Sequence, residues 1–373
     1  MNRRAVRLER QTGWGLAEMM VGVMISMIAV LVIFESFSAF EAQKRTTTSA
    51  IAAQEAGLLA LSAIERDARV AGYGLVVNNA LACTTINIYQ AGALAAIPAM
   101  PIAIADGGAT ASDSITFMYS TSSFAATPSA LTIDAPTSTP VVMVGNTANN
   151  AAFTAGDFIM LAQPTMGKPC ARLRVTGTVA AGSDVQILHA SSDPSNPPSA
   201  VNLFPTAPSA GYTASTSDPS VAINMGAMVN STYSVLNGSL AYMDNTRGAG
   251  PITLSTGIVS LQAQYGVASA GSQTVNEWVD AKGSWATPSA VDIARIKAVR
   301  IAIIARSALL EKDNVTQPCV NSAGTNKGPC AWLDNAASPA PLIDLSADPN
   351  WQRYRYRVYE TIIPLRNIVW GNL

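Results

Sequence analysis

The chain has little charge and a single histidine. Lys, Arg, Asp and Glu together make up 13% of its 373 residues, and the net charge is -1. A nucleic-acid-binding surface needs clustered lysine and arginine on a basic domain, so this balance argues against nucleic acid as a partner. The abundance of small residues, with 26 Gly and 21 Pro among them, is typical of an exported, β-rich protein.

The motifs of common enzyme classes are also absent. There is no Walker A sequence, no H-E-x-x-H, no dinucleotide fingerprint and no G-x-S-x-G. A Ser-His-Asp arrangement would have to use His189, which lies in a predicted strand over 184–190, where a lone histidine is usually structural. The acidic groups at Glu311–Asn314, Asp344 and Asp348 lack the spacing of a calcium loop, so solvated turns are the simpler interpretation. We therefore expect no enzyme activity, no cofactor and no metal site.

Four cysteines occur, at Cys83, Cys170, Cys319 and Cys330. An even number in an exported chain predicts two disulfides, and four cysteines allow three pairings. We favour Cys319–Cys330, because CVNSAGTNKGPC is a short Gly/Asn/Pro loop whose ends meet easily, which leaves Cys83–Cys170 as the second pair. Four buried free thiols are the alternative. A zinc site is disfavoured, because there is no CxxC and His189 lies far from every cysteine in the sequence.

The amino-terminal region lacks proline as far as Ile97 and lacks charge over a long stretch. From Trp14 to Phe34, Glu18 is the only charged side chain, and a helix of that length spans about 30 Å, the thickness of a bilayer core. The basic segment 1–13 predicts a cytoplasmic amino end, with the rest of the chain outside. A cleaved secretory signal, with its site near Ser36–Ala39, is the alternative, but the apolar run is longer than a usual signal core.

The helix is expected to continue beyond this segment. Gly72 and Gly74, in the stretch RVAGYG, supply stop signals. We predict a helix over 14–72, about 85 Å long, with 14–34 spanning the membrane and 35–72 amphipathic. Its buried stripe is predicted from apolar residues at helical spacing, which are Ile51, Leu58, Leu61, Ile64 and Ala68.

Short apolar runs separated by turn residues follow, which predicts a β-rich head over 73–373. Arginine alternates with Tyr or Val over 353–358, which predicts one solvated and one buried face. The segment 191–227, rich in Ser and Pro, predicts long loops within a variable, loop-rich region over 121–245. The predicted strands are Ser114–Ser120, Gly156–Gln163, Arg172–Val179, Asp184–Ala190, Gly257–Val267, Ile296–Ser307 and Arg353–Asn367.

The stretch GWGLAEMMV, from Gly13 onward, resembles the class III signal of type IV pilins and type II secretion pseudopilins. In that family a prepilin peptidase cuts after the glycine and methylates the new amino terminus, which implies both events at Gly13 and Trp14. Glu18 becomes the fifth mature residue, where the family keeps a glutamate. The resemblance implies that its carboxylate pairs with the amino-terminal ammonium of an adjoining subunit. Trp14, Gly15 and Ala17 depart from the family's usual residues, which bears on processing rather than on the charge pair.

Further segments resemble the PilW-type minor pilins, mostly before residue 121 and in roughly the last 120 residues, whereas the middle of the chain, about 121–245, matches only through GDFIMLA. The resemblance implies an α+β, type IV pilin-like fold, in which a long membrane-spanning helix packs on a carboxy-terminal antiparallel β-rich head. It also implies a non-enzymatic minor pilin that acts in a priming and tip complex during pilus assembly. The segments are IERDARVAGYG, SDSITFMY, GDFIMLA, STGIVSLQAQYGV, VDIARIKAVRIAIIARS and YRYRVYETIIPLRNI.

The partners implied by this resemblance are other minor pilins, the major pilin, prepilin peptidase, the inner-membrane assembly platform and a tip adhesin. The implied location is the inner membrane as a single-pass protein with its head in the periplasm, and then the pilus fibre or tip. Two alternatives stay open at this point. One is a J-like minor pseudopilin of a type II secretion system, and the other is a membrane-tethered adhesin that binds a surface through its variable region.

Overall fold

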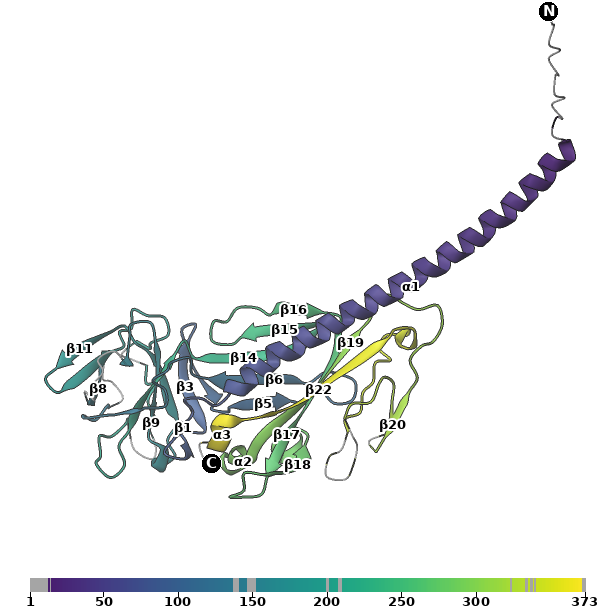
Figure 1. The fold of residues 1–373 in the computed structure, drawn as a ribbon. Coiled ribbons are helices and arrows are strands. Elements are labelled where there is room, and N and C mark those ends of the chain that lie inside the picture. Colours follow the sequence, from purple (N-terminus) through teal and green to yellow (C-terminus); the bar gives the residue numbers. More distant parts are fainter. Residues whose placement is uncertain are drawn as a thin grey trace, which may run out of the picture. The chain divides into compact units, whose positions relative to one another are not determined.

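The fold is that of a computed structural model of the chain (Figure 1), and contacts divide it into two units, residues 1–51 and 52–373. One helix, α1 (Leu16–Val70), runs from the first unit into the second. The second unit also contains every strand among the described residues. The structure describes residues 13, 15–136, 141–145, 152–198, 201–206, 210–322, 324–332, 335, 338 and 340–370.

The helix α1 ends at Val70, shortly before two glycines with positive φ. Gly72 and Gly74 have φ of 82° and 80°, a conformation that glycine adopts without steric cost, as the sequence predicts for a helix stop. A Cβ on Gly74 would lie 2.8 Å from the Ser120 Cβ, so the turn also needs the missing side chain. The helix predicted over 14–72 is therefore found over Leu16–Val70.

The head is built from antiparallel sheets, and this confirms the predicted α+β class. The one parallel pairing among the described strands joins β3 to β10. The six-stranded sheet has the order β4 (Ala93–Pro98), β3 (Thr85–Gln90), β10 (Cys170–Arg174), β9 (Phe158–Ala162), β13 (Val221–Gly226), β7 (Ser129–Ala130). A three-stranded sheet has the order β11 (Gly177–Ala181), β12 (Asp184–Leu188), β8 (Val141–Gly145).

Two further sheets and several short elements complete the head. The five-stranded sheet has the order β16 (Ile252–Thr256), β15 (Ser239–Asp244), β14 (Val229–Leu236), β6 (Ser114–Tyr119), β5 (Ile102–Ala105). The four-stranded sheet has the order β18 (Val275–Val279), β17 (Ile258–Ala268), β19 (Ile296–Arg306), β22 (Tyr356–Pro364). The short elements are the hairpins β1 (Val76–Val77)–β2 (Ala80–Leu81) and β20 (Cys319–Asn321)–β21 (Gly324–Asn326), the helices α2 (Ala290–Arg295) and α3 (Arg366–Trp370), and the 3-10 turns η2 (Pro164–Met166), η3 (Gly283–Trp285) and η4 (Trp351–Arg353).

The largest core lies between α1 and the four- and five-stranded sheets. The helix contributes Ala53, Ala60, Ile64 and Ala68, all buried, so the predicted stripe is correct at Ile64 and Ala68. It is wrong at two positions and only half right at a third, because Ile51 is 51% exposed, Leu58 is 50% exposed and Leu61 is half-buried. Small residues face the sheet instead, since close approach of helix and strand leaves no room for a larger side chain.

Gly57 gives the clearest sign of this close approach. A Cβ built on Gly57 would lie 2.2 Å from the Tyr359 Cε2 on β22, a distance that packed atoms do not tolerate. The glycine therefore lets the tyrosine ring lie directly against the helix backbone. In Figure 1 the part of α1 after residue 51 runs across the strands of the head.

Two strand predictions need correction. The single strand predicted over Arg172–Val179 is two strands, β10 and β11, which pair in different sheets, so the chain turns between Arg174 and Gly177. The strand predicted over Arg353–Asn367 is β22, preceded by η4 and followed by α3. The alternation predicted over 353–358 is present only from Arg355 onward. Arg355 and Arg357 are exposed while Tyr356 and Val358 are half-buried, whereas Arg353 and Tyr354 are both half-buried.

The middle of the chain contains more strands than the sequence predicts. Residues 121–245 contain the strands β7 to β15 among their described residues, although no named strand lies among the described residues of 191–220, as the loop prediction expects. The prediction of a loop over 191–227 is wrong at its end, where β13 is buried at all six positions. β13 was missed because its sequence, VAINMG, does not alternate between polar and apolar residues. Strands that are covered on both faces typically lack this alternation.

Candidate functional site

The amino-terminal end of α1 brings Gly15 and Glu18 together. The Gly15 N–H donates to Glu18 Oε2 at 3.2 Å, and the Met19 N–H donates the first helical bond to the Gly15 carbonyl oxygen at 3.1 Å. Glu18 thus satisfies a free N–H and faces the positive end of the helix dipole. A carboxylate has about four acceptor sites, so it can take a further donor. Gly13 is exposed, and Trp14, the other residue of the predicted cleavage site, lies outside the described residues.

The first half of α1 presents an apolar surface on all sides. Every large apolar side chain from Leu16 to Phe40 is between 56% and 80% exposed. A helix that is apolar all round belongs in lipid or among other helices. Among the described residues, α1 is the one helix long and apolar enough to cross a membrane. Glu18 lies at the start of this exposed apolar surface.

A buried carboxylate fixes the second half of α1 to the head. Asp67 is 2% exposed and accepts hydrogen bonds from Tyr233 Oη at 2.7 Å and from Arg66 Nε at 3.2 Å. Burial and the negative charge of Asp67 raise the pKa of Tyr233, so the phenol stays a donor. Tyr233 lies on β14, so the pair sets the position of α1 along that strand. The sequence feature that could have predicted this contact is Asp67 itself, an acidic residue one turn after Ile64 in the apolar stripe of the helix.

Two disulfides are present, and both lie in the head. Cys83–Cys170 joins the chain just before β3 to the first residue of β10, across a sequence separation of 87 residues. Both cysteines are buried. Cys319–Cys330 closes a loop of separation 11 around β20 and β21, and both of its cysteines are half-buried. These are the pairs that the sequence favours, and the described residues contain no free cysteine.

The acidic residues considered for calcium have other partners. Asp344 pairs with Lys327 at 3.2 Å, and Asp348 pairs with Arg306 at 2.8 Å. Glu311 accepts from Arg355 at 2.7 Å. Each of these three carboxylates thus forms an ion pair with a side-chain cation. Within the described part of the chain, no three residues of the types His, Cys, Asp and Glu gather in an arrangement that could hold a metal ion.

His189 follows β12 and is a structural residue. It is 8% exposed, its ring lies 6.4 Å from that of Phe204, and its Nε2 has no hydrogen-bond partner among the described residues. Burial lowers the pKa of His189 to about 4. The ring is therefore neutral at pH 7.

We expect the burial of His189 to make the head acid-sensitive. Its pKa is lowered from 6.5 to about 4, so the unfolded chain binds a proton that the folded chain does not between these values. Stability is therefore lost as the pH falls from about 6.5 to about 4, by about 2 kcal/mol at pH 5. The measurement is urea unfolding of the detergent-solubilised chain at pH 7 and pH 5, for the wild type and for His189→Asn. Because the chain has no other histidine, the difference between the two proteins isolates this group. An identical pH response of both would contradict the prediction.

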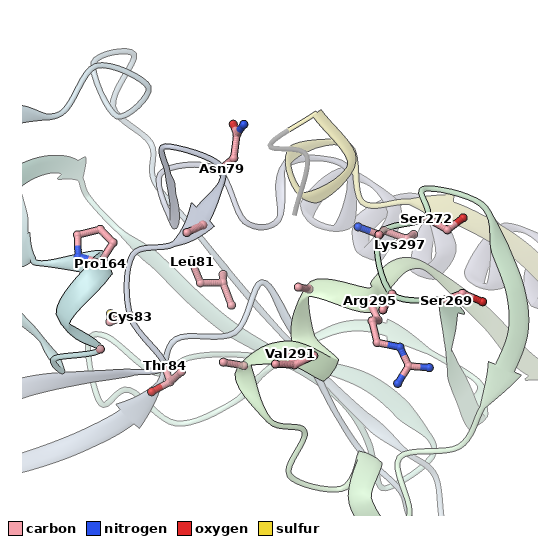
Figure 2. A pocket seen from close by; sticks show the side chains of 16 residues that line it. Asn79, Leu81, Cys83, Thr84, Pro164, Ser269, Ser272, Val291, Arg295 and Lys297 are labelled. Carbon is pink, nitrogen blue, oxygen red and sulfur yellow. The ribbon is translucent and has the colours of Figure 1, made fainter.

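A cavity of about 430 Å³ lies between the six-stranded and four-stranded sheets (Figure 2). One wall comes from the β1–β2 hairpin, the chain at Cys83 and Thr84, and the η2 turn. The opposite wall comes from the β17–β18 turn, α2 and the start of β19. The Cys83–Cys170 disulfide lies in the first wall and ties it to β10. The side chains that matter for its chemistry are Asn79, Leu81, Ser269, Val291, Arg295 and Lys297.

The charged side chains of this cavity are both cations. Arg295 forms an ion pair with Asp292, with its Nη1 3.1 Å from Asp292 Oδ1, and its Nε donates to the Ala268 carbonyl oxygen at 3.0 Å. In Figure 2 its guanidinium points away from the hairpin. Lys297 is 2% exposed, and burial lowers its pKa. In the same view its ammonium points toward the space between the hairpin and the β17–β18 turn. No acidic residue is among the described residues that line the cavity. Sequence reasoning missed this site, because its two walls are far apart in the chain.

Comparison with known proteins identifies one family. Residues 225–367 match the family described as "Type IV Pilus-assembly protein W". This segment runs from the end of β13 to α3 and includes β17, β19 and β22. The family is one of structural and assembly proteins, not of enzymes. No curated protein matches the chain, and no solved structure does.

Proposed function

Because residues 225–367 match the family described as "Type IV Pilus-assembly protein W", we propose that this chain is a minor pilin that primes pilus assembly and lies near the pilus tip. The observation that carries this proposal is the apolar surface at the start of α1. A helix exposed on every side over Leu16–Phe40 needs lipid before assembly and other helices afterwards. The family match supports a pilus as the place where those helices are found.

In this proposal Glu18 sets the position of the helix in the fibre. Its carboxylate accepts the amino-terminal ammonium of a neighbouring subunit, freed by cleavage after Gly13 and methylated at Trp14. Attraction between the charges is strong in an apolar environment, and either charge alone there is costly. The hydrogen bond from the Gly15 N–H uses one acceptor site of Glu18, and the remaining sites are available to the neighbour.

The proposed organisation follows from these roles. Residues 1–13 are a basic leader that stays in the cytoplasm, 14–34 cross the inner membrane, and 73–373 form the periplasmic head. The four arginines of the leader support this orientation, because cytoplasmic segments are enriched in positive charge. The partners are other minor pilins, the major pilin, prepilin peptidase, the inner-membrane assembly platform and a tip adhesin.

A J-like pseudopilin of type II secretion is the second candidate. It would share the exposed apolar helix and Glu18, so those features do not separate the two functions. The family match favours the pilus, since its description names pilus assembly.

The first test of the proposal is processing. Expression of the chain with a cognate prepilin peptidase is expected to remove the leader, and sequencing of the mature protein should begin at N-methylated Trp14. The matched control is Gly13→Val, which should block cleavage because the family's cut follows a glycine. A mature terminus after Ser36–Ala39 would instead indicate a secretory signal and would refute the anchor.

A further inference from the structure

A second pocket of the head lies on the face of the four-stranded sheet that is opposite to α1. Leu261 and Ala263 of β17 belong to the core against α1, so Gln262 between them points to the other face. The pocket has a volume of about 290 Å³. Its walls come from the loop 109–112, the β14–β15 turn, the first residues of β17 and β22, the last residue of β19 and the segment 343–348. We refer to it as the Gln262 pocket.

The amide of Gln262 is nearly buried, and its hydrogen bonds within the chain are incomplete. The residue is 5% exposed. Its Nε2 donates to the Ala111 carbonyl oxygen and to Ser260 Oγ, both at 3.4 Å, which is longer than is usual for such bonds. Its Oε1 accepts no hydrogen bond from the described residues, yet it keeps contact with solvent. A ligand that donates to Oε1 would therefore complete the hydrogen bonding of this amide.

Other uncharged polar groups line the pocket beside this amide. Ser260 is 4% exposed, and its Oγ accepts from Gln262, which leaves its O–H free to donate to a ligand. The Oγ of Ser112 accepts from the Leu261 N–H at 3.3 Å and keeps its O–H in the same way. Asn237, on the β14–β15 turn, adds an exposed amide. Hydroxyl and amide groups both donate and accept, so they suit a ligand with several groups of the same kind.

The charges of the Gln262 pocket are balanced. Among its described lining residues the charged ones are Arg306, Asp344 and Asp348. Arg306 pairs with Asp348 at 2.8 Å, and Asp344 pairs with Lys327 at 3.2 Å. An ion in the pocket would lose its hydration and would meet side chains whose charges are already compensated, which is costly. The pocket therefore favours a neutral ligand.

Size and apolar surface narrow the ligand further. The volume of about 290 Å³ is at the lower end of the range of about 300–1,000 Å³ that is typical of ligand pockets. Val259, Leu345 and Tyr356 line the pocket and are half-buried, so they offer apolar surface to C–H groups. A small neutral ring with C–H faces and hydroxyls around its edge has all of the required properties. Such a ring is a sugar.

We propose that the Gln262 pocket binds a neutral hexose, free or as the terminal residue of a glycan. One sugar hydroxyl donates to Gln262 Oε1, and others bond Ser112 and Ser260. The site goes beyond the proposed function and does not depend on it, because the anchor and Glu18 contribute nothing to the lining. Of the variable region 121–245, the described lining residues include only the β14–β15 turn, so this site differs from the adhesive surface considered from the sequence.

The test measures binding of the methyl glycosides of glucose, galactose and mannose to the full chain by saturation-transfer NMR titration. The chain is held in dodecylphosphocholine, a detergent without a sugar headgroup that could compete. We expect saturable binding of at least one of the three. The matching methyl uronoside, which carries a carboxylate, and the matching 2-amino glycoside, which carries an ammonium, should each bind at least tenfold more weakly. Equal binding of either charged analogue, or no binding of any of the three glycosides, would overturn the proposal.

A further arm identifies the source of the hexose. The ligand in this arm is a trisaccharide that carries the bound hexose at its non-reducing end. Binding as tight as that of the methyl glycoside would show that the pocket takes the end of a glycan. Binding at least tenfold weaker would show that it takes the free sugar.

Matched variants locate the binding. Gln262→Met removes the amide with little change in volume and should weaken hexose binding about tenfold. Ala111→Phe should weaken it at least tenfold by filling the pocket, and Ala111 is exposed, so this variant leaves the core intact. The controls are Gln54→Met and Ala95→Phe, at exposed positions that do not line the pocket. Unchanged binding by Ala111→Phe, or an equal loss in Ala95→Phe, would contradict binding in the Gln262 pocket.

Discussion

Replacing Glu18 with alanine is expected to leave cleavage after Gly13 intact and to remove the chain from assembled pili. In the proposed fibre this carboxylate neutralises the amino terminus of a neighbour inside an apolar helix bundle. Breaking such a buried pair leaves an unpaired charge and costs about 3–5 kcal/mol. That cost corresponds to a loss of more than a hundredfold in incorporation. The measurement is the ratio of this chain to major pilin in sheared, purified pili, with the processed chain in the membrane quantified alongside.

Glu35→Ala is the matched control for this experiment. Glu35 lies on the same helix, is exposed, and follows the end of the apolar segment, so its loss removes the same charge without removing the proposed pair. We expect its incorporation to equal that of the wild type. Glu18→Ala also deletes the hydrogen bond from the Gly15 N–H, and loss of this capping interaction costs only about 1 kcal/mol. Near-normal incorporation of Glu18→Ala would therefore remove the pairing from the mechanism.

Removing the Cys83–Cys170 disulfide is expected to destabilise the head more than removing Cys319–Cys330. A cross-link restricts the unfolded chain in proportion to the logarithm of the loop that it closes. The separations are 87 and 11 residues, which correspond to losses of about 4–5 and about 3 kcal/mol on the chain-entropy model. The double alanine variants at each pair should be compared by thermal unfolding of the detergent-solubilised chain. Alanine is the suitable replacement, because Cys170 is fully buried and a serine there would bury an unpaired hydroxyl.

Mild reduction of the wild type provides an independent control. The half-buried Cys319–Cys330 bond should be reduced first and the buried Cys83–Cys170 bond later. The first reduction should lower the melting temperature, and the second should lower it by a larger amount. If the Cys319 and Cys330 variant proved the less stable of the two, the loop-entropy explanation would be wrong. Local contacts around the short loop would then dominate.

The sequence alone was informative where the structural signal is local. The long apolar run, the absence of proline and the paired Gly72 and Gly74 predicted α1 to within two residues at each end. β17 and β19 were predicted from short apolar runs bounded by turn residues, a pattern that lies within each strand. The position of Glu18 in the sequence was enough to identify it as a functional candidate. A single carboxylate in an apolar run is energetically costly in lipid, so such a residue usually has a functional role.

The structure decided what depends on residues far apart in the chain. Helical spacing predicted a stripe through Leu58, but Gly57 and Ala60 face the sheet, because the distance between α1 and β22 is set by Tyr359. Spacing along one segment carries no information about the size of the side chain that will be opposite it. The hydrogen bond between Asp67 and Tyr233 could not be predicted for the same reason, because the two residues are 166 positions apart in the sequence.

The cavity is the clearest feature that the sequence could not predict. Its walls come from segments near residues 80, 165, 270 and 295, and nothing in the sequence of one wall specifies the other. They meet because β10 pairs in parallel with β3, the Cys83–Cys170 disulfide holds that edge, and α2 leads directly into β19. The sequence by itself determined a membrane-capable helix carrying one carboxylate, followed by a β-rich head. Only the order of strand pairing, a long-range property, determined the cavity between the two sheets and its positive charge.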